Sequence, residues 1–309
     1  YGLVGSEMCI RDRDVVYRSL DSMFRDDPQW NQLRGEDCFI LPFGDDSICI
    51  HSIETDNVSQ EAIQGILGKI DCSCTFLSPA ICLDQTAPLS QKQHTFESIM
   101  STLHAAGIPI GKGHTIEMPL STFCAIDAVS IQEYTEGDKG KFLVSSVDII
   151  SQMFPGDAET SVEIGINNAL KDVVAKGAYS IEYLVPKVSA ASPEDAHTSI
   201  CAVQQYARRL HLKEFLDSEQ LPCHEYLIGA HVGASCDVPI LASTAQVGDV
   251  VVLSRPLGTL FVLNTPEHFP AYGEDDHVYE KAVGWLRKCD MPLARILVAY
   301  RDNIHAAKD

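Results

Sequence analysis

One succession of strands and helices occurs twice along this chain, and it constrains the fold more than any other feature. Short apolar runs bounded by turn residues predict the strands, and apolar residues at helical spacing after serine N-caps predict the helices. Each half reads strand, helix, strand, helix, strand: 44–56, 59–69, 74–83, 90–106 and 121–131, then 141–150, 160–176, 181–188, 192–210 and 227–235. We therefore predict an α/β fold with an internal duplication of about 100 residues.

Segments outside the two halves complete the predicted element order. A helix is expected within 14–38, ahead of a strand at Phe39–Phe43, and residues 107–119 are expected to form a loop. After the second half, GDVVVL at 248–253 predicts a strand, which a Pro-Gly turn follows. Two further helices are expected, at 278–289 and 290–301.

These elements divide the chain into three domains and a leader. We expect a first domain at 14–133, a second at 141–245, and the start of a third, α/β domain at 246–309. The third has one predicted strand and two helices, too few to close a core, so we expect it to be truncated. The leader, residues 1–13, reads YGLVGSEMCIRDR. It resembles sequencing-adaptor read-through and is left out of the fold.

Composition excludes several classes of function. Hydrophobic residues make up 45% and charged residues 21% of the chain, as in globular proteins, and no apolar window reaches membrane-spanning length. The net charge of −20 disfavours nucleic acid and anionic membranes as partners, because both need clustered Lys and Arg. Carboxylates can still hold Mg²⁺ against the phosphates of a nucleotide. The 11 cysteines lack zinc-site spacing, so we expect free thiols in a reducing cytoplasm.

Five short segments carry recognisable motifs. They are AGIPIGKGHTIEMP (106–119), FLVSSVDII (142–150), NNALKDVVAKG (167–177), QVGDVVVLSRPLGT (246–259) and NIHAAKD (303–309). In this order they resemble the Gly-Gly-His-Ser loop, the strand ending in Thr-Thr-Asp, the Asn-x-x-x-Asp helix, the opening of the second domain, and the approach to the Asp-(Val/Ile)-Thr-Gly-Phe-Gly motif of selenophosphate synthetases. These enzymes, the selenide, water dikinases, belong to the AIR-synthetase-like superfamily.

The resemblance implies both a fold and an activity. The fold would be an α/β (α+β) fold of the AIR-synthetase type, in which two N-terminal-like domains form an internal pseudo-dimer ahead of a C-terminal α/β domain. The activity would be ATP-dependent phosphoryl transfer, with selenide and ATP giving selenophosphate, AMP and phosphate. Mg²⁺ and ATP, with selenide or a related small molecule, are the implied cofactor and partners. A homo-oligomer is the alternative to the internal pseudo-dimer.

The resemblance also implies which residues form the site. Asp148, Asn168 and Asp172 would bind ATP together with the loop residues Gly113, His114 and Thr115. Asn168 and Asp172 are four residues apart, so they share one face of a helix. Asp172 and Asp309 would be Mg²⁺ ligands, and Asp127 is a further metal candidate because its spacing to Asp148 also suits the family's first-strand aspartate. Lys112 is a catalytic candidate, and Asp45, Asp46 and Asp56 are weaker site candidates.

The losses relative to the family fall on one of two sites. In the first half, Gly65 stands where the helix carboxylate is expected, and in the second half LKEFLDSEQLP replaces the glycine loop. A site that combines the second half's carboxylates with the first half's loop would be complete. The other combination would lack both parts. We therefore expect a pseudo-dimer with one competent site and one degenerate site.

Two departures leave the reaction open. The family's Gly-x-Cys-x-Lys loop has no counterpart in the sequence, and Glu163 stands where the family carries Arg. Two alternatives therefore stand beside selenophosphate synthesis. One is a catalytically silent relative that binds a nucleotide or an active synthetase. The other is a different ATP-using enzyme of the same superfamily.

Overall fold

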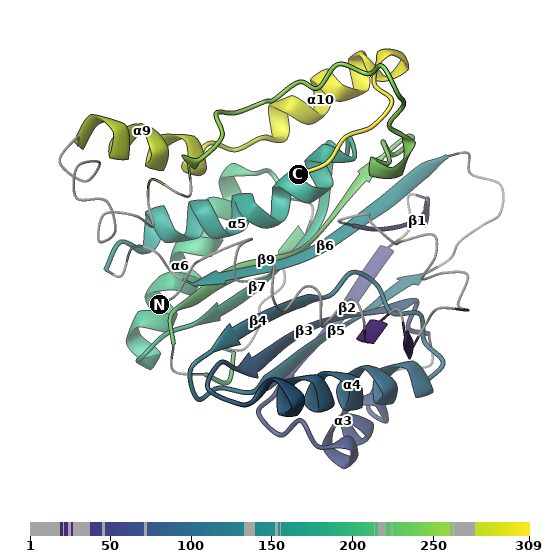
Figure 1. Ribbon diagram of the computed structural model, residues 1–309, viewed down its shortest axis with the longest axis vertical. Coiled ribbons are helices and arrows are strands. Elements are labelled where there is room, and N and C mark those ends of the chain that lie inside the picture. The colour runs from purple at the N-terminus through teal and green to yellow at the C-terminus, as the bar shows by residue number, and fades with distance from the viewer. Residues whose placement is uncertain are drawn as a thin grey trace.

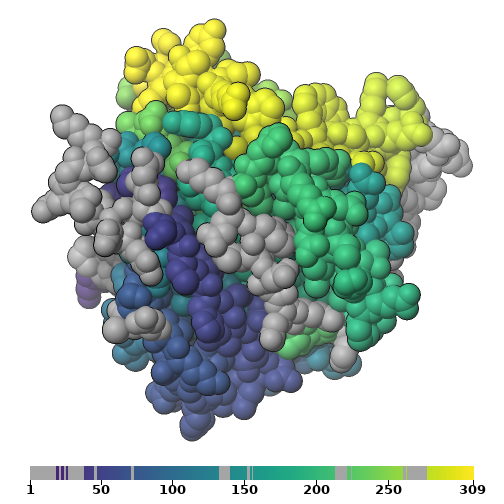
Figure 2. Space-filling view, turned by 180° about the vertical axis from the view of Figure 1, so that it is seen from behind, coloured from purple at the N-terminus to yellow at the C-terminus, as the bar shows by residue number. Residues whose placement is uncertain are grey.

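The computed structural model shows an α/β protein in which two sheets face each other and helices cover their outer faces (Figure 1). It describes residues 19–20, 22–23, 26, 38–44, 47–70, 73–132, 140–151, 154, 156–212, 214–215, 221–223, 225–259, 262 and 276–309. The first half of the chain lies at one end of the molecule and the C-terminal elements lie at the other (Figure 2). None of the described helices combines the length and the apolar character needed to cross a membrane.

The first sheet has four strands in the order β2-β5-β3-β4. Its elements along the chain are β2 (Ser47–Thr55), α3 (Gln60–Leu67), β3 (Phe76–Asp84), α4 (Leu89–Ala105), β4 (His114–Met118) and β5 (Phe123–Gln132). Strand β3 is buried along almost its whole length, which explains its continuous apolar sequence. Helix α3 begins after Ser59, whose side chain accepts a hydrogen bond from the Ala62 backbone N–H.

The second sheet has the same topology as the first, with one strand added. Its elements are β6 (Lys141–Ser151), α5 (Ala158–Ala175), β7 (Ser180–Ser189), α6 (Pro193–Arg209), β8 (Glu214–Phe215) and β9 (Leu227–Cys236). The order β6-β9-β7-β8 repeats the order of the first sheet, and the parallel and antiparallel pairings repeat as well. The extra strand, β1 (Phe39–Phe43), pairs with β6, so an early segment of the chain joins the second sheet. The duplicated pattern in the sequence is thus a duplicated topology.

Apolar side chains from both sheets fill the space between them. One cluster joins Ala80 and Ala125 of the first sheet to Val147 and Ile149 of the second. Outside the sheets, α3 and α4 cover the first, whereas α5 and α6 cover the second (Figure 1). Helix α6 begins at Pro193 after the N-cap Ser192, as its sequence predicts.

Two of the predicted elements are wrong. Residues 107–119 contain strand β4, because Ala80 to Asp84 of β3 offer a parallel partner that local sequence does not reveal. The predicted strand at 248–253 does not form, and no described strand pairs with this segment. Val250, Val251 and Val252 are 85%, 84% and 83% exposed. Strand propensity without a hydrogen-bonded neighbour is not sufficient for a strand.

The remaining elements lie after the second sheet. They are η1 (Ala242–Thr244), α9 (Asp276–Arg287), α10 (Met291–Ala299) and η2 (Arg301–Asn303). Helices α9 and α10 match the two helices predicted there, and both pack against α5. The helix predicted within 14–38 lies almost entirely outside the described residues.

Candidate functional site

A cluster of acidic and amide side chains lies where β6 meets α5. Alternate residues of β6 face this helix, among them Ser146 and Asp148. Asn168 on α5 donates a hydrogen bond from Nδ2 to Asp148 Oδ2. One turn later, Asp172 accepts a hydrogen bond at Oδ2 from Ser146 Oγ at 2.6 Å. Three residues named from the sequence therefore lie together, and Ser146 is an added member that the sequence did not indicate.

The first sheet contributes a loop to the same place. His114, the first residue of β4, has its Nδ1 2.9 Å from Asp148 Oδ1. The carbonyl of Lys112, two residues earlier, accepts a 2.6 Å hydrogen bond from Ser78 Oγ on β3. Thr115 follows His114 within β4, so the two side chains leave the strand on opposite faces. The site is thus composite, built from both halves of the chain.

The two glycines of this loop are required by close packing. A Cβ atom at Gly111 would lie 2.8 Å from Phe76 Cδ2. One at Gly113 would lie 2.7 Å from the carbonyl oxygen of Pro79. Real Cβ atoms do not approach other atoms so closely, so only glycine lets the loop lie against β3. That close approach determines where Lys112 and His114 lie.

The end of the chain lies along α5 and completes the cluster (Figure 1). The buried Lys176 donates from Nζ to the carbonyl of Ala307 at 3.4 Å. Two residues further on, Asp309 is close enough to Asp172 to act on its ionisation. Residues from the first sheet, the second sheet and the C-terminal segment therefore meet around Asp172.

The surroundings of Asp172 disfavour its ionised form. Burial raises the pKa of Asp172 well above its usual range, and the nearby charges of Asp148 and Asp309 raise it further. The hydrogen bond from Ser146 and the positive charge of Lys112 act in the opposite direction, but they do not outweigh the other causes. An added cation would favour the ionised carboxylate.

The donor set fits Mg²⁺ bound together with phosphate oxygens. Among the described residues, no three His, Cys, Asp or Glu side chains are placed to enclose a metal ion on their own. Mg²⁺ is commonly held by one or two carboxylates, with water and substrate phosphates supplying its other ligands. Asp172 with Asp309 matches that pattern, whereas a cage built only from protein ligands does not.

Asp127 does not join the cluster, and its expected role as a metal ligand is corrected. It is fully buried between the two sheets, whereas Asp148 and Asp172 lie on the helix side of the second sheet. Its Oδ1 lies 2.7 Å from Lys187 Nζ, and its Oδ2 lies 2.9 Å from His231 Nδ1. An ammonium group that already neutralises the carboxylate leaves no charge for a metal ion to compensate.

The weaker candidates also lie apart from the cluster. Asp56 is exposed at the bend after β2. The pairing registers make Ile53, not Asp56, the counterpart of Asp148: Ile53 pairs with Ile126 of β5, just as Asp148 pairs with Ala230 of β9. Asp45 and Asp46 lie outside the described residues. An apolar residue at the equivalent position agrees with the expectation that the first half's own site is degenerate.

Fold and site thus define a class: a duplicated α/β protein with a composite acidic site between its halves. No family model matches the sequence, and no curated protein matches it. Among solved structures, a protein from Thermus thermophilus is 14% identical, with 52% of this chain and 54% of that chain covered and a TM-score of 0.41. Thiamine monophosphate kinase from Aquifex aeolicus is 12% identical, with 54% and 60% covered and a TM-score of 0.36.

A third similar structure is HypE, a hydrogenase maturation protein from E. coli. It is 13% identical, with 79% of this chain and 97% of that chain covered and a TM-score of 0.27. This chain spans little more than half the length of the first of these structures. The similarity to all three is distant, with TM-scores below 0.5, and by itself it assigns no function.

Proposed function

We propose that this protein binds ATP with Mg²⁺ at the composite site and transfers a phosphoryl group from it. One observation carries the proposal: a glycine-flanked Lys-Gly-His loop from one half meets Asp148, Asn168 and Asp172 of the other. Phosphoryl transfer depends mainly on positioning the nucleotide and on neutralising the charge of its phosphates. A buried acidic cluster beside a lysine provides places for both a metal ion and phosphates.

Each residue of the site would have a separate task. Asp172 and Asp309 would hold Mg²⁺, which supplies the positive charge that the phosphates require. Asn168 donates a hydrogen bond to Asp148, and His114 Nδ1 lies 2.9 Å from its other carboxylate oxygen, so both contacts orient this carboxylate. Lys112 would lie beside the phosphates, since its ammonium group already acts on Asp172. Backbone N–H groups near Gly113 would bind phosphate oxygens.

Selenophosphate synthesis from selenide, ATP and water is the specific reaction that we propose, with AMP and phosphate as co-products: selenide takes one phosphoryl group, and water takes the other. It rests on the resemblance of the five motifs to selenide, water dikinases. A second candidate is a silent relative that binds the nucleotide without turnover, and Glu163 favours it. Glu163 forms ion pairs with Arg209 at 2.6 Å and Arg287 at 2.5 Å. This position therefore carries a carboxylate neutralised by two arginines, whereas the family carries a positively charged Arg there.

Titration calorimetry with MgATP tests the nucleotide site. We expect one ATP per chain and an affinity at least about tenfold lower in Asp172→Asn, equal to about 1.4 kcal/mol, because the carboxylate that binds Mg²⁺ is lost. Asp56→Asn is the matched control, since this exposed aspartate lies at the bend after β2, apart from the cluster, and should not alter binding. Two ATP per chain would contradict a single competent site, and no binding would overturn the proposal.

Product analysis separates the candidate reactions. With selenide present, release of AMP and phosphate supports selenophosphate synthesis. Release of ADP supports a different ATP-using enzyme. If ATP binds with the expected stoichiometry but no product accumulates with selenide or without it, the silent relative is the correct interpretation.

A further inference from the structure

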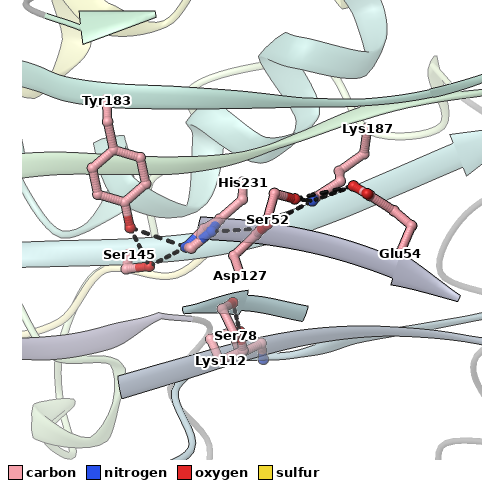
Figure 3. A network of polar contacts seen from close by, with 9 residues as sticks. All are labelled: Ser52, Glu54, Ser78, Lys112, Asp127, Ser145, Tyr183, Lys187 and His231. Atoms are coloured by element: carbon pink, nitrogen blue, oxygen red, sulfur yellow. Dashed lines mark hydrogen bonds and ion pairs between the residues drawn. The ribbon is translucent and has the colours of Figure 1, made fainter. Parts of the chain in front are cut away.

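A second polar cluster lies buried between the two sheets (Figure 3). Its Ser145 and the candidate site's Ser146 are consecutive residues of β6, so the two clusters lie on opposite faces of that strand. Lys187 Nζ on β7 lies 2.7 Å from Asp127 Oδ1 and donates to Ser52 Oγ at 2.8 Å. It also forms an ion pair with Glu54 at 3.7 Å. The imidazole of His231 bridges Asp127 to Ser145, with 2.9 Å and 2.8 Å contacts. We call these residues, with Tyr183, the intersheet network.

The network contains a Ser-His-Asp arrangement but is not a nucleophilic site. Ser145 contacts His231, which in turn contacts Asp127, as the nucleophile, base and orienting acid of a catalytic triad do. Each of them is 0% exposed, so no substrate can reach the serine hydroxyl. The hydroxyl of Tyr183 also lies 3.0 Å from both Ser145 Oγ and His231 Nε2, and it satisfies these groups within the protein. The network is therefore part of an interface.

The acidic groups of this interface lie on the first sheet, and its basic groups lie on the second. Strands β5 and β9 are each ten residues long, and aligning them end to end makes Asp127 equivalent to His231. Asp127 pairs with Ser52 and Ser78 of the first sheet, and His231 pairs with Val147 and Val185 of the second. The same registers make Glu54 equivalent to Ile149 and Ala80 equivalent to Lys187. The first sheet thus supplies the carboxylates, and the second supplies the ammonium and the imidazole.

The equivalent positions confirm that the interface has two unlike ends. At one end Lys187 meets Ser52, Glu54 and Asp127. At the other end the equivalent residue, Ala80, packs in an apolar cluster with Val147 and Ile149. A symmetric interface would have the same contacts at both ends. This interface is asymmetric because the two halves carry different residues at matching positions.

Pairing of like sheets from two chains would bury unpaired charges. Two first sheets would place Glu54 and Asp127 opposite Ala80, which offers no base. Two second sheets would place Lys187 opposite Val147 and Ile149, which offer no acid. A buried charge without a partner is strongly unfavourable. Pairing of the first sheet with the second is therefore favoured over both pairings of like sheets.

We propose that the intersheet network selects pairing of the first sheet with the second and prevents like sheets of separate chains from pairing. The network thereby maintains the composite site, a consequence that rests on the proposed function. Ser78, the cross-strand neighbour of Asp127, holds the Lys112 carbonyl, and Ser145 adjoins Ser146 on β6. Like pairing would separate the Lys112–His114 loop from Asp148 and Asp172.

Refolding at high protein concentration tests the selection, because the sheets choose their partners again. The variant Asp127→Asn/Glu54→Gln/Lys187→Met removes both carboxylates and the ammonium group of the network and leaves the His231 imidazole in place. We expect the wild-type chain to regain its original mass by light scattering. We expect the triple variant to give, in addition, particles of twice that mass. A triple variant that returns only to the wild-type mass would overturn the proposal.

An ion pair within the first half provides the matched control. Lys92 Nζ lies 2.6 Å from Glu117 Oε2, and these side chains are 12% and 9% exposed. The variant Lys92→Met/Glu117→Gln should lower the urea midpoint without doubling the refolded mass, because it does not face the second sheet. Doubling in this control as well would show a general effect of destabilisation and would also overturn the proposal.

A double-mutant cycle covers the case in which the triple variant does not refold. Asp127→Asn and Lys187→Met should each lower the urea midpoint, and together they should lower it less than the sum of both. Strictly additive losses would contradict coupling between the sheets. Neither the mass nor the urea midpoint depends on a nucleotide. A chain that passes both tests but binds no MgATP would therefore refute the proposed function alone.

Discussion

Two buried aspartates show how neighbouring residues decide the ionisation of one side-chain type. Burial alone would raise the pKa of Asp127, but the charges of Lys187 and His231 outweigh burial and hold that pKa below its usual range. For Asp172, burial and the charges of Asp148 and Asp309 act together and raise the pKa. The surroundings of Asp127 therefore favour its ionised form, whereas the surroundings of Asp172 disfavour it.

The lowered pKa of Asp127 predicts how stability depends on pH. A carboxylate with a lowered pKa in the folded state stabilises the fold above its unfolded pKa, near 3.9, and this contribution is lost as the pH falls through the folded pKa. We expect the stability difference between wild type and Asp127→Asn to be largest near neutral pH and to shrink below about pH 4. Urea unfolding of both proteins from pH 7 to pH 3 measures it. A difference that grows on acidification would contradict the pairing with Lys187.

At the scale of elements, glycines allow β9 to pack closely against its neighbours. A Cβ atom at Gly229 would lie 2.0 Å from the carbonyl oxygen of Asp148. One at Gly233 would lie 2.1 Å from Cε1 of the Tyr183 ring. Gly229 therefore lies against the backbone of β6, and Gly233 lies against the Tyr183 ring of the intersheet network.

Alanine substitution at Gly229 and at a glycine in a helix should distinguish the effect of close packing from that of helix propensity. Gly229→Ala is expected to destabilise the fold by about 3 kcal/mol, because backbone atoms of β6 occupy the space of the new methyl group. Gly65→Ala in α3 is the control: no atom lies within 4 Å of its added Cβ. This helical site should gain roughly 0.5–1 kcal/mol. Chemical unfolding measures both, and an equal response of the two sites would contradict the packing described for β9.

At the scale of the whole molecule, the segment 247–257 differs from the rest of the surface. Val247, Val250, Val251, Val252, Leu253 and Leu257 are between 59% and 110% exposed. No described strand pairs with this apolar, β-branched run, and runs of this kind are an established source of aggregation. Since the net charge of −20 opposes association elsewhere, we expect self-association to depend on this segment.

A single charge within the segment tests that expectation. Val251→Glu should reduce the growth of light scattering with protein concentration several-fold, because it breaks the apolar run. The urea midpoint should stay unchanged, since Val251 is 84% exposed and contributes little to the core. Thr86→Glu serves as a control charge at an exposed turn. If this control reduces scattering equally, net charge and not the apolar segment governs association.

The sequence alone determined most of the local structure and one part of the site. Apolar periodicity predicted the helices of both halves, and the serine N-caps Ser59 and Ser192 marked the starts of α3 and α6, because both signals lie within a few residues of the element. The start expected at Ser90 was wrong, since α4 begins at Leu89 after Pro88, which caps no backbone N–H. The motif resemblance brought together Asp148, Asn168, Asp172 and His114. It also named Asp309 and Lys112, which act electrostatically on Asp172. Ser146 was missed, because a serine within a buried strand has no distinguishing local pattern.

Only the tertiary structure decided which segments pair and which charges meet. Local sequence predicted a loop where β4 pairs with β3 and a strand at 248–253 where no partner is described, because strand formation depends on a distant neighbour. It also assigned Asp127 to a metal site, whereas Lys187, 60 residues further along the chain, neutralises this carboxylate. Ionisation and strand pairing both depend on contacts between residues remote in sequence, and those contacts exist only once the chain has folded.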